Sequence, residues 1–185
     1  MIALNKPTTP PWTTPDQYWP ALSRATEALD PPYAAVSVPA LAHNAHDMLA
    51  RANGTTIRVA SKSVRVRGVI ESVLALPGYH GVLAYTLAEA LWLAETIDDI
   101  VVGYPTADRD ALRTLATSET LARRVTVMVD SVAQLDLIDA VIAPSGREPI
   151  RVCLELDASW DSKTIGFTGV FRSPIRTREQ ALLLA

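Results

Sequence analysis

The sequence predicts an α/β protein that forms part of a (β/α)8 TIM-type barrel with parallel strands, preceded by an N-terminal arm. Short apolar runs rich in β-branched residues recur along the chain, and such runs are typical of strands buried on both faces. Amphipathic helical patterns separate the runs, as parallel strands require. Strand starts roughly 20–25 residues apart favour a barrel over a doubly wound sheet.

The first 32 residues form the predicted arm, and residues 33–185 the predicted barrel domain. Seven of the chain's prolines crowd into the arm. Because proline fixes the backbone and removes a donor, we expect an extended segment with one short helix at about residues 16–29. The aromatic residues Trp12, Tyr18 and Trp19 indicate that the arm packs against another part of the protein.

The barrel elements follow in order. Apolar runs predict strands at Tyr33–Val38, Ile57–Ala60, Gly81–Ala84, Ile100–Gly103, Val125–Val129 and Ile150–Leu156, the first of which could lie outside the barrel. A helical face over residues 41–52 has Pro39 near its start and Gly54 past its end, as helices favour. A second helical pattern covers residues 69–74. Capping boxes begin at Thr86, Ser131 and Thr177, each with Glu or Gln three residues later.

Five or six βα units fall short of the eight that close a barrel. The chain also ends within an apolar helical pattern at residues 178–185. We therefore expect the front part of a longer protein, truncated before the last barrel strands. The alternative is a complete short protein that closes its sheet through a partner chain.

Composition narrows the function classes. Of the 185 residues, 49% are apolar and 20% charged, which is typical of a globular domain. The net charge of −3 and the lack of a long basic stretch predict no nucleic-acid partner. No apolar run is long enough to span a membrane, so no membrane partner is expected. Cys153 is the single cysteine, which favours a reducing, cytoplasmic location.

Lys62 is the strongest functional candidate. The chain has three lysines against fourteen arginines, and only Lys62 directly follows an apolar strand run. An amine can form a Schiff base with a carbonyl, whereas a guanidinium cannot. The carboxyl ends of barrel strands form the active end, so a partly desolvated lysine there predicts a nucleophile. The alternative is a surface lysine at a strand end.

Polar residues at the other strand ends should converge on the same edge. They are Tyr85-Thr86, Tyr104-Pro105-Thr106, Asp130-Ser131 and Asp157-Ala158-Ser159. Each is a possible ligand contact, and we select Tyr85 and Asp130 as the candidates. Thr86, Thr106 and Ser131 have an alternative structural role, because Thr and Ser are good helix N-caps. His43 and His46 lie three apart and could share a metal. No third ligand is evident in the sequence, so we predict a solvated helix face and no metal site.

The segment Ile57–Ser63, followed by a helix, resembles the cofactor-lysine strand of the alanine racemase N-terminal domain family, the fold-type III pyridoxal-phosphate (PLP) proteins. Further segments resemble that family in the right order: Ala35–Val38 with Ala40–Asn44, Gly81–Ala90, Asp99–Gly103, Val125–Gln134, Ile150–Asp157 and Gly166–Arg172. The resemblance covers roughly residues 33–185. Ser63, a hydroxyl residue directly after the lysine, resembles the D-threonine aldolase and D-serine dehydratase branch. The whole stretch is most similar to proteins described as amino acid deaminase/aldolase.

The resemblance implies that PLP forms a Schiff base with Lys62, and that Lys62 then removes or returns protons. The strand-end candidates Tyr85 and Asp130 would then contact this cofactor, and the resemblance matches Arg172 to an arginine that contacts the phenolic oxygen of PLP. The expected activity is aldol cleavage, deamination or racemisation of a D-amino acid similar to D-threonine or D-serine. The alternatives are a non-catalytic PLP-binding protein or an inactive fragment. The resemblance also implies a possible homodimer, and a C-terminal β domain beyond these residues.

Overall fold

The computed structural model describes all residues from 1 to 185. The chain divides into two compact units, one formed by residues 1–59 and 64–80 and the other by residues 60–63 and 81–185. The predicted boundary between an arm at 1–32 and a domain at 33–185 stays a prediction.

The arm contains a 3-10 turn, η1 (Pro11–Thr13), and helix α1 (Pro15–Thr26). Pro15 opens α1, where its missing N–H removes no helical hydrogen bond. Helix α2 (Val38–Ala52) follows, and the ring of its His43 meets the ring of Trp12 edge to face, with centroids 5.0 Å apart. The arm therefore packs against α2 through Trp12.

A small core holds the first unit together. Helix α2 and helix α3 (Arg67–Leu74) contribute to a cluster of Leu4, Ala42, Ala45, Val73 and Tyr79. The Tyr79 hydroxyl donates to the Ala45 carbonyl at 2.9 Å, and His46 Nε2 lies 3.0 Å from the Leu4 carbonyl. The N-terminal residues are thus tied to the helices by both apolar and polar contacts. The solvated helix face predicted at His43 and His46 is wrong, because both residues are half-buried and contact the arm.

The strand predicted at Tyr33–Val38 is wrong. Residues 33–37 have no regular structure, and α2 begins at Val38. Tyr33 and Val36 are each 49% exposed, and this run pairs with no other strand. An apolar, β-branched run becomes a strand only where a neighbouring strand and a packed face receive it, and Pro39 favours a helix start instead.

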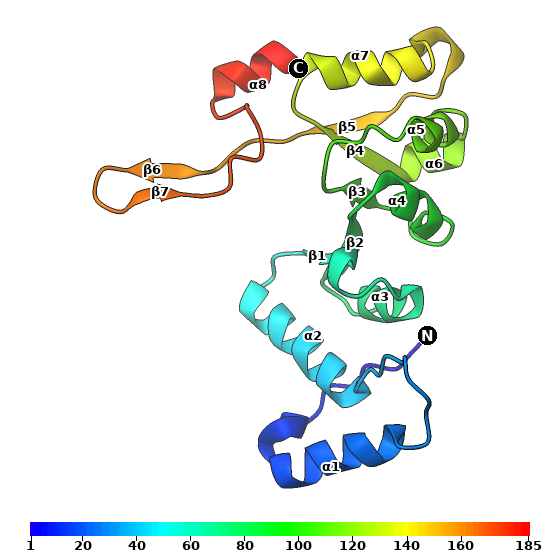
Figure 1. Cartoon of the computed structure of the whole chain (residues 1–185), viewed down its shortest axis with the longest axis vertical. Coiled ribbons are helices and arrows are strands. Elements are labelled where there is room, and N and C mark those ends of the chain that lie inside the picture. The colour runs from blue at the N-terminus through cyan, green and yellow to red at the C-terminus, as the bar shows by residue number, and fades with distance from the viewer. The chain divides into compact units, whose positions relative to one another are not determined.

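Five strands form one sheet in the order β1-β2-β3-β4-β5 (Figure 1). They are Ile57–Ala60, Tyr79–Ala84, Ile100–Val102, Val125–Val129 and Arg151–Leu154. The ladders from β2 to β5 are parallel, with Val82 opposite Ile100 and Ile100 opposite Val125. Sheet order equals chain order and helices lie between successive strands, which is the arrangement of part of a (β/α) barrel. The predicted fold class is confirmed.

Strand β1 departs from the buried strand that the sequence predicted. Its residues alternate between half-buried and exposed, because β1 is the edge strand of the sheet. The central strands do match the prediction on the face that their helices cover. There the side chains of Val82, Ile100, Val102, Val125, Val127 and Val129 are all at most 1% exposed. On the opposite face Leu83 is 38% exposed.

The second unit carries the covering helices α4 (Leu87–Leu93), α5 (Arg109–Ala116), α6 (Glu119–Arg124) and α7 (Val132–Val141). Helix α5 packs against α4, α6 and α7 (Figure 1). Thr86 caps α4, because its side chain accepts from the Glu89 N–H at 3.2 Å. The capping box predicted at Ser131 is wrong: the Ser131 side chain makes no cap hydrogen bond. Instead the Gln134 side chain accepts from the Asp130 N–H at 2.7 Å.

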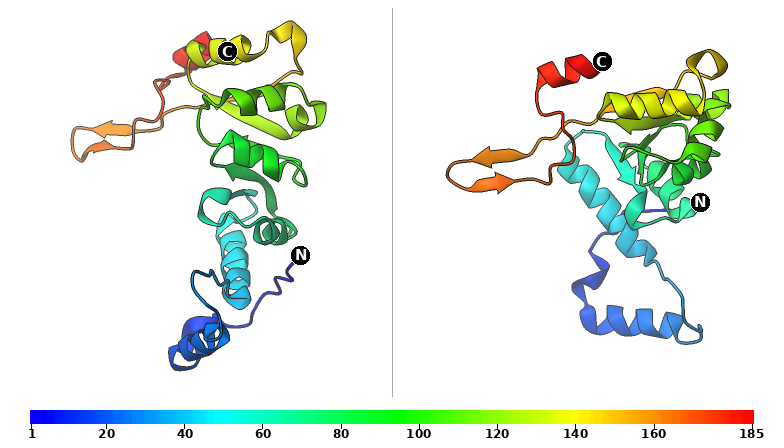
Figure 2. Two further views of the ribbon diagram at one scale, coloured as in Figure 1. Left: turned by 45° about the vertical axis from the view of Figure 1, so that its right-hand side comes forward. Right: turned by 45° about the horizontal axis from the view of Figure 1, so that its top comes forward.

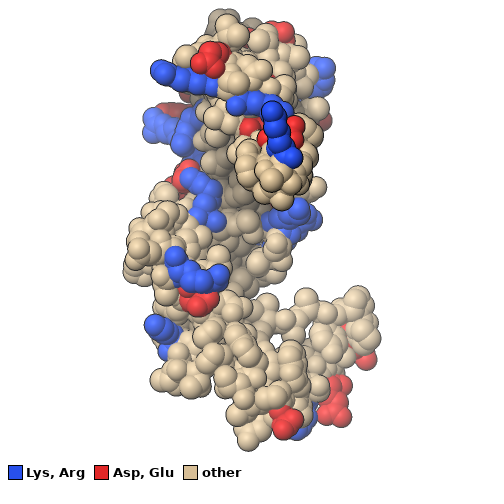
Figure 3. Space-filling view, turned by 90° about the vertical axis from the view of Figure 1, so that its left-hand side faces the viewer, with Lys and Arg blue, Asp and Glu red and all other residues tan.

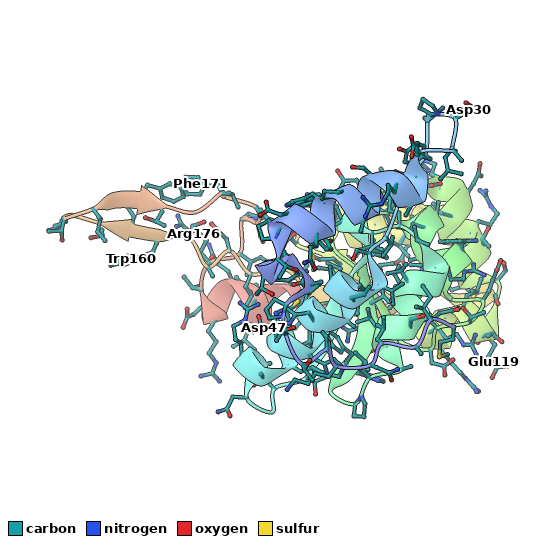
Figure 4. All side chains as sticks on the ribbon, turned by 90° about the horizontal axis from the view of Figure 1, so that it is seen from below. Asp30, Asp47, Glu119, Trp160, Phe171 and Arg176 are labelled. Atoms are coloured by element: carbon teal, nitrogen blue, oxygen red, sulfur yellow. The ribbon has the colours of Figure 1, made fainter.

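After β5 the chain forms a hairpin of β6 (Trp160–Ser162) and β7 (Gly166–Thr168), and then helix α8 (Arg178–Leu184). Both further views show the hairpin extending away from the strands β3–β5 (Figure 2). Trp160 and Phe171, labelled in Figure 4, are 57% and 60% exposed. The sequence prediction did not include this hairpin. The predicted capping box at Thr177, which opens α8, is complete.

On the face drawn in Figure 3, basic and acidic side chains are interspersed. None of the helices combines the length and the apolar character that crossing a bilayer requires.

Candidate functional site

Lys62 lies directly after β1, in a short 3-10 turn, η2 (Ser61–Ser63). Ser61 is fully buried and its hydroxyl donates to the Leu83 carbonyl of β2 at 3.3 Å. This bond anchors the turn to the neighbouring strand. The next side chain, Lys62, is exposed, so the predicted partial desolvation of this lysine is wrong. The turn presents the amine to solvent at the carboxyl end of the sheet.

The tyrosines that end β2 and β3 extend the site from Lys62. The Lys62 Nζ lies 5.6 Å from the centroid of the Tyr85 ring. The Tyr85 and Tyr104 rings meet edge to face, with centroids 5.3 Å apart and planes at 79°. Both tyrosine residues are 39% exposed. A cation over an aromatic face and an edge-to-face pair are each favourable, so these contacts form a continuous row.

Arg172 completes the row from the other side. Its Cζ lies 4.3 Å from the centroid of the Tyr104 ring. Its Nη2 donates to the Gly103 carbonyl at 2.6 Å and lies 2.6 Å from Glu155 Oε1. The Glu155 side chain is only 10% exposed. The structure thus brings together Lys62, Tyr85 and Arg172, three of the four predicted site residues, with Tyr104 between the last two.

Asp130, the fourth predicted site residue, follows the end of β4. Its N–H donates to Gln134, and its half-buried carboxylate makes no contact that joins it to the Lys62–Arg172 row. Its role as a cofactor contact stays a prediction.

Asp157, a strand-end candidate, has local partners instead. Its Oδ1 accepts from the Ser159 N–H at 3.0 Å and from the Ser159 hydroxyl at 2.5 Å. Its Oδ2 lies 3.4 Å from Arg176 Nε. The Ser159 hydrogen bond, with the Ser159 N–H and the Arg176 charge adding to it, lowers the pKa of Asp157 below its ordinary value against the opposing effect of desolvation. This carboxylate therefore stays ionised and stabilises the base of the hairpin.

Two hollows flank the row. One, of about 360 Å³, is lined by Tyr85, Thr86, Tyr104 and Thr106 among other residues. The other, also about 360 Å³, is lined by Glu155, Asp157 and Arg172 with the base of the hairpin. A cleft of this size suits a small molecule, so both sides of the Tyr104–Arg172 contact can receive one.

The sequence prediction left out two partners of Arg172. Gly103 contributes its backbone carbonyl. Every residue type carries this group, so the sequence gives no sign of the contact. Glu155 lies within the run predicted as the last strand and becomes a partner only when the loop after β7 folds back. Tyr104 was among the strand-end residues, but its contact with an arginine 68 positions later in the chain follows from no local pattern.

Comparison with known proteins agrees with this geometry. A search of curated proteins finds no match to the chain. The family model for the alanine racemase N-terminal domain matches residues 36–168, which include Lys62, the whole parallel sheet and the hairpin. Since this match covers well over half of the sequence, the chain belongs to the alanine racemase N-terminal domain family.

Proposed function

We propose that this chain holds PLP on Lys62 and acts at the α-carbon of a D-amino acid, with D-threonine or D-serine as the model substrate. The family is PLP-dependent in general and of fold type III. The observation that carries the proposal is the row that joins the Lys62 amine to the Arg172 guanidinium through Tyr85 and Tyr104.

The residues of the row fit the chemistry of this cofactor. Lys62 offers an amine, Tyr85 and Tyr104 offer aromatic surfaces, and Arg172 offers donors for an oxygen that carries negative charge. When bound, PLP would supply two groups: an aldehyde that reacts with an amine, and a ring that takes up the electron pair left at the α-carbon. No residue of the row is acidic, and Arg172 offsets the charge of the adjacent Glu155.

Each residue has a role in the proposal. The Lys62 amine is the nucleophile, and it afterwards removes or returns a proton at the α-carbon as a general base or acid. The Tyr85 ring limits where the Lys62 Nζ can lie. Arg172 donates hydrogen bonds to the phenolic oxygen of the cofactor. A small amino acid is the proposed partner, and a cytoplasmic location and a homodimer remain parts of the proposal.

Binding of PLP without turnover is the second candidate. It is favoured by the exposure of the row: Tyr85 and Tyr104 are each 39% exposed, and the Arg172 side chain is 38% exposed. Enzymes usually exclude water from such a site. A site this open can hold a cofactor while giving little control over which α-carbon bond breaks.

The visible spectrum of the chain mixed with PLP, followed by borohydride reduction and peptide mapping, tests the cofactor site. We expect a reduced pyridoxyl group on Lys62. The chain's own Lys6 and Lys163 are matched controls, since both are exposed lysines outside the row. Labelling spread over all three lysines, or absent from Lys62, would contradict the proposal.

Product analysis then separates the activities. D-threonine should give glycine and acetaldehyde by aldol cleavage, D-serine should give pyruvate and ammonia by deamination, and racemisation should give the L-enantiomer. A protein that labels at Lys62 but gives none of these products is the PLP-binding protein of the second candidate. L-threonine and L-serine are the control substrates, because the proposal expects a preference for the D-enantiomers.

A further inference from the structure

The backbone around Arg172 does not by itself hold the guanidinium end of this long side chain in place. Arg172 follows the exposed residues Val170 and Phe171 in the loop after β7. The backbone is anchored on both sides of Arg172: the Val170 and Phe171 N–H groups donate to the Ser159 hydroxyl at 3.2 and 3.4 Å, and the buried Ser173 donates to the Glu155 carbonyl at 2.6 Å. None of these bonds reaches the guanidinium. A long arginine side chain loses much rotamer entropy when it is ordered, so contacts at its guanidinium end must hold it in place.

The two polar contacts of that guanidinium meet at one atom. Nη2 makes both the bond to the Gly103 carbonyl and the contact with Glu155. Two contacts at one corner of a planar group fix that corner and leave the plane free to pivot around it. The contact that acts on the plane itself is the Tyr104 ring, which lies 4.3 Å from Cζ.

We propose that Tyr104 is a positioning residue for Arg172, and that its ring sets the orientation of the guanidinium plane. In that orientation Nη2 is occupied, while Nη1 and Nε remain as donors for an anionic oxygen. The ring of Tyr104 is itself restrained by its edge-to-face contact with Tyr85, which also contacts the Lys62 amine. The orientation of Arg172 is therefore tied to the lysine end of the row. The inference rests on the proposed function where it concerns PLP.

The first test needs no cofactor. In the whole chain with labelled arginine, the ring current of Tyr104 should displace the NMR signals of the Arg172 δ-methylene and Nε–H, which the Arg172→Lys variant identifies. We expect Tyr104→Leu to return these signals to the values of a solvent-exposed arginine, and Tyr104→Phe to keep them displaced. Unchanged signals in a folded Tyr104→Leu chain would overturn the proposal.

The second test measures PLP. Removing an exposed cation–π contact of this kind corresponds to an affinity loss of about two- to fivefold, which is the loss we expect for Tyr104→Leu. Tyr104→Phe should restore the affinity, since it keeps the ring. A Trp160→Leu variant removes an exposed aromatic residue outside the row and should bind PLP as the unchanged protein does.

A double-mutant cycle decides whether Tyr104 acts through Arg172. If it does, Tyr104→Leu combined with Arg172→Gln should weaken PLP binding and shift the pH midpoint of the cofactor's absorption band no more than Arg172→Gln alone. Effects that add would mean that the two residues act separately, and would overturn the proposal. If PLP never labels Lys62 while the NMR signals still depend on Tyr104, the proposed function fails and the positioning contact stands.

Discussion

Tyr85 and Tyr104 meet edge to face at the carboxyl ends of neighbouring parallel strands, with ring centroids 5.3 Å apart. Each ring also lies beside a cation, Lys62 for Tyr85 and Arg172 for Tyr104. The pair therefore connects an amine and a guanidinium that come from opposite sides of the strand ends. This relationship makes the row testable by changing either ring.

Replacing Tyr85 with leucine should affect both stability and reactivity. The edge-to-face pair contributes about 0.5–1.5 kcal/mol beyond area burial, so we expect a loss of that size in the free energy of unfolding, measured in urea. Labelling of Lys62 by PLP and borohydride should also become slower, because the Tyr85 ring no longer limits the position of the Lys62 amine. Tyr85→Phe keeps the ring and is the control. Equal labelling rates in the leucine variant and the unchanged protein would contradict the prediction.

Replacing Gly169 with alanine should destabilise the base of the hairpin. A Cβ at Gly169 would lie 2.1 Å from Ser159 Oγ and 2.8 Å from Ser159 Cα, and the residue has a φ of +143°. Since backbone as well as side chain must move, we expect a loss of about 1–3 kcal/mol in the free energy of unfolding, with faster proteolysis of residues 159–171. Gly146→Ala is the matched control, because nothing lies within 4 Å of its added Cβ. A Gly169→Ala chain with the same free energy of unfolding as the unchanged protein would mean that Ser159 does not pack against Gly169 in solution.

Stability at acid pH should depend on Asp157. Its pKa in the folded chain lies below the ordinary value, through the Ser159 hydrogen bond first and the Arg176 charge as well. Ionised Asp157 therefore stabilises the fold above about pH 4, the pKa range of an unfolded aspartate. This contribution is lost as the pH falls through the lowered folded-state pKa. Unfolding measured from pH 7 downward should show a shallower acid decline for Asp157→Asn than for the unchanged protein.

The control for this pH dependence is Asp136→Asn, which changes an exposed carboxylate on α7. It should leave the acid decline as it is. An Asp157→Asn chain with the same decline as the unchanged protein would show that the Ser159 and Arg176 contacts do not form in solution.

Thr86 and Ser131, the hydroxyl residues that precede α4 and α7, should contribute differently to the free energy of unfolding. Thr86 accepts a cap hydrogen bond from Glu89, whereas the Ser131 side chain makes none. Loss of a cap costs about 0.5–2 kcal/mol, so we expect that cost for Thr86→Ala and a smaller one for Ser131→Ala. Thermal unfolding of both variants measures the difference. Equal losses would indicate that Ser131 does cap α7.

The sequence predicted those features that follow from residues close together in the chain. The central strands and their helices appear where periodicity placed them, since a covered face requires apolar residues at fixed spacing. The strand before Lys62 also formed at the predicted residues, although as a half-exposed edge strand rather than a buried one. One failure involves a distant partner, since residues 33–37 found no neighbouring strand. The other is local: the spacing at Ser131 matched a capping box, but the Gln134 side chain accepts from the Asp130 N–H and the Ser131 side chain makes no cap hydrogen bond.

The residues of the candidate site also fall into two groups, those that the sequence could place and those that only the folded chain brings in. The sequence by itself determined that Lys62, Tyr85 and Tyr104 end neighbouring strands, because parallel strands present their carboxyl ends at one edge of a sheet. Only the tertiary structure decided that Arg172 reaches the same edge, where it bonds to Gly103, 69 residues earlier. The physical reason is that the path of the loop after β7 depends on the Ser173 and Asp157 anchors, whose partners become neighbours only when the chain has folded.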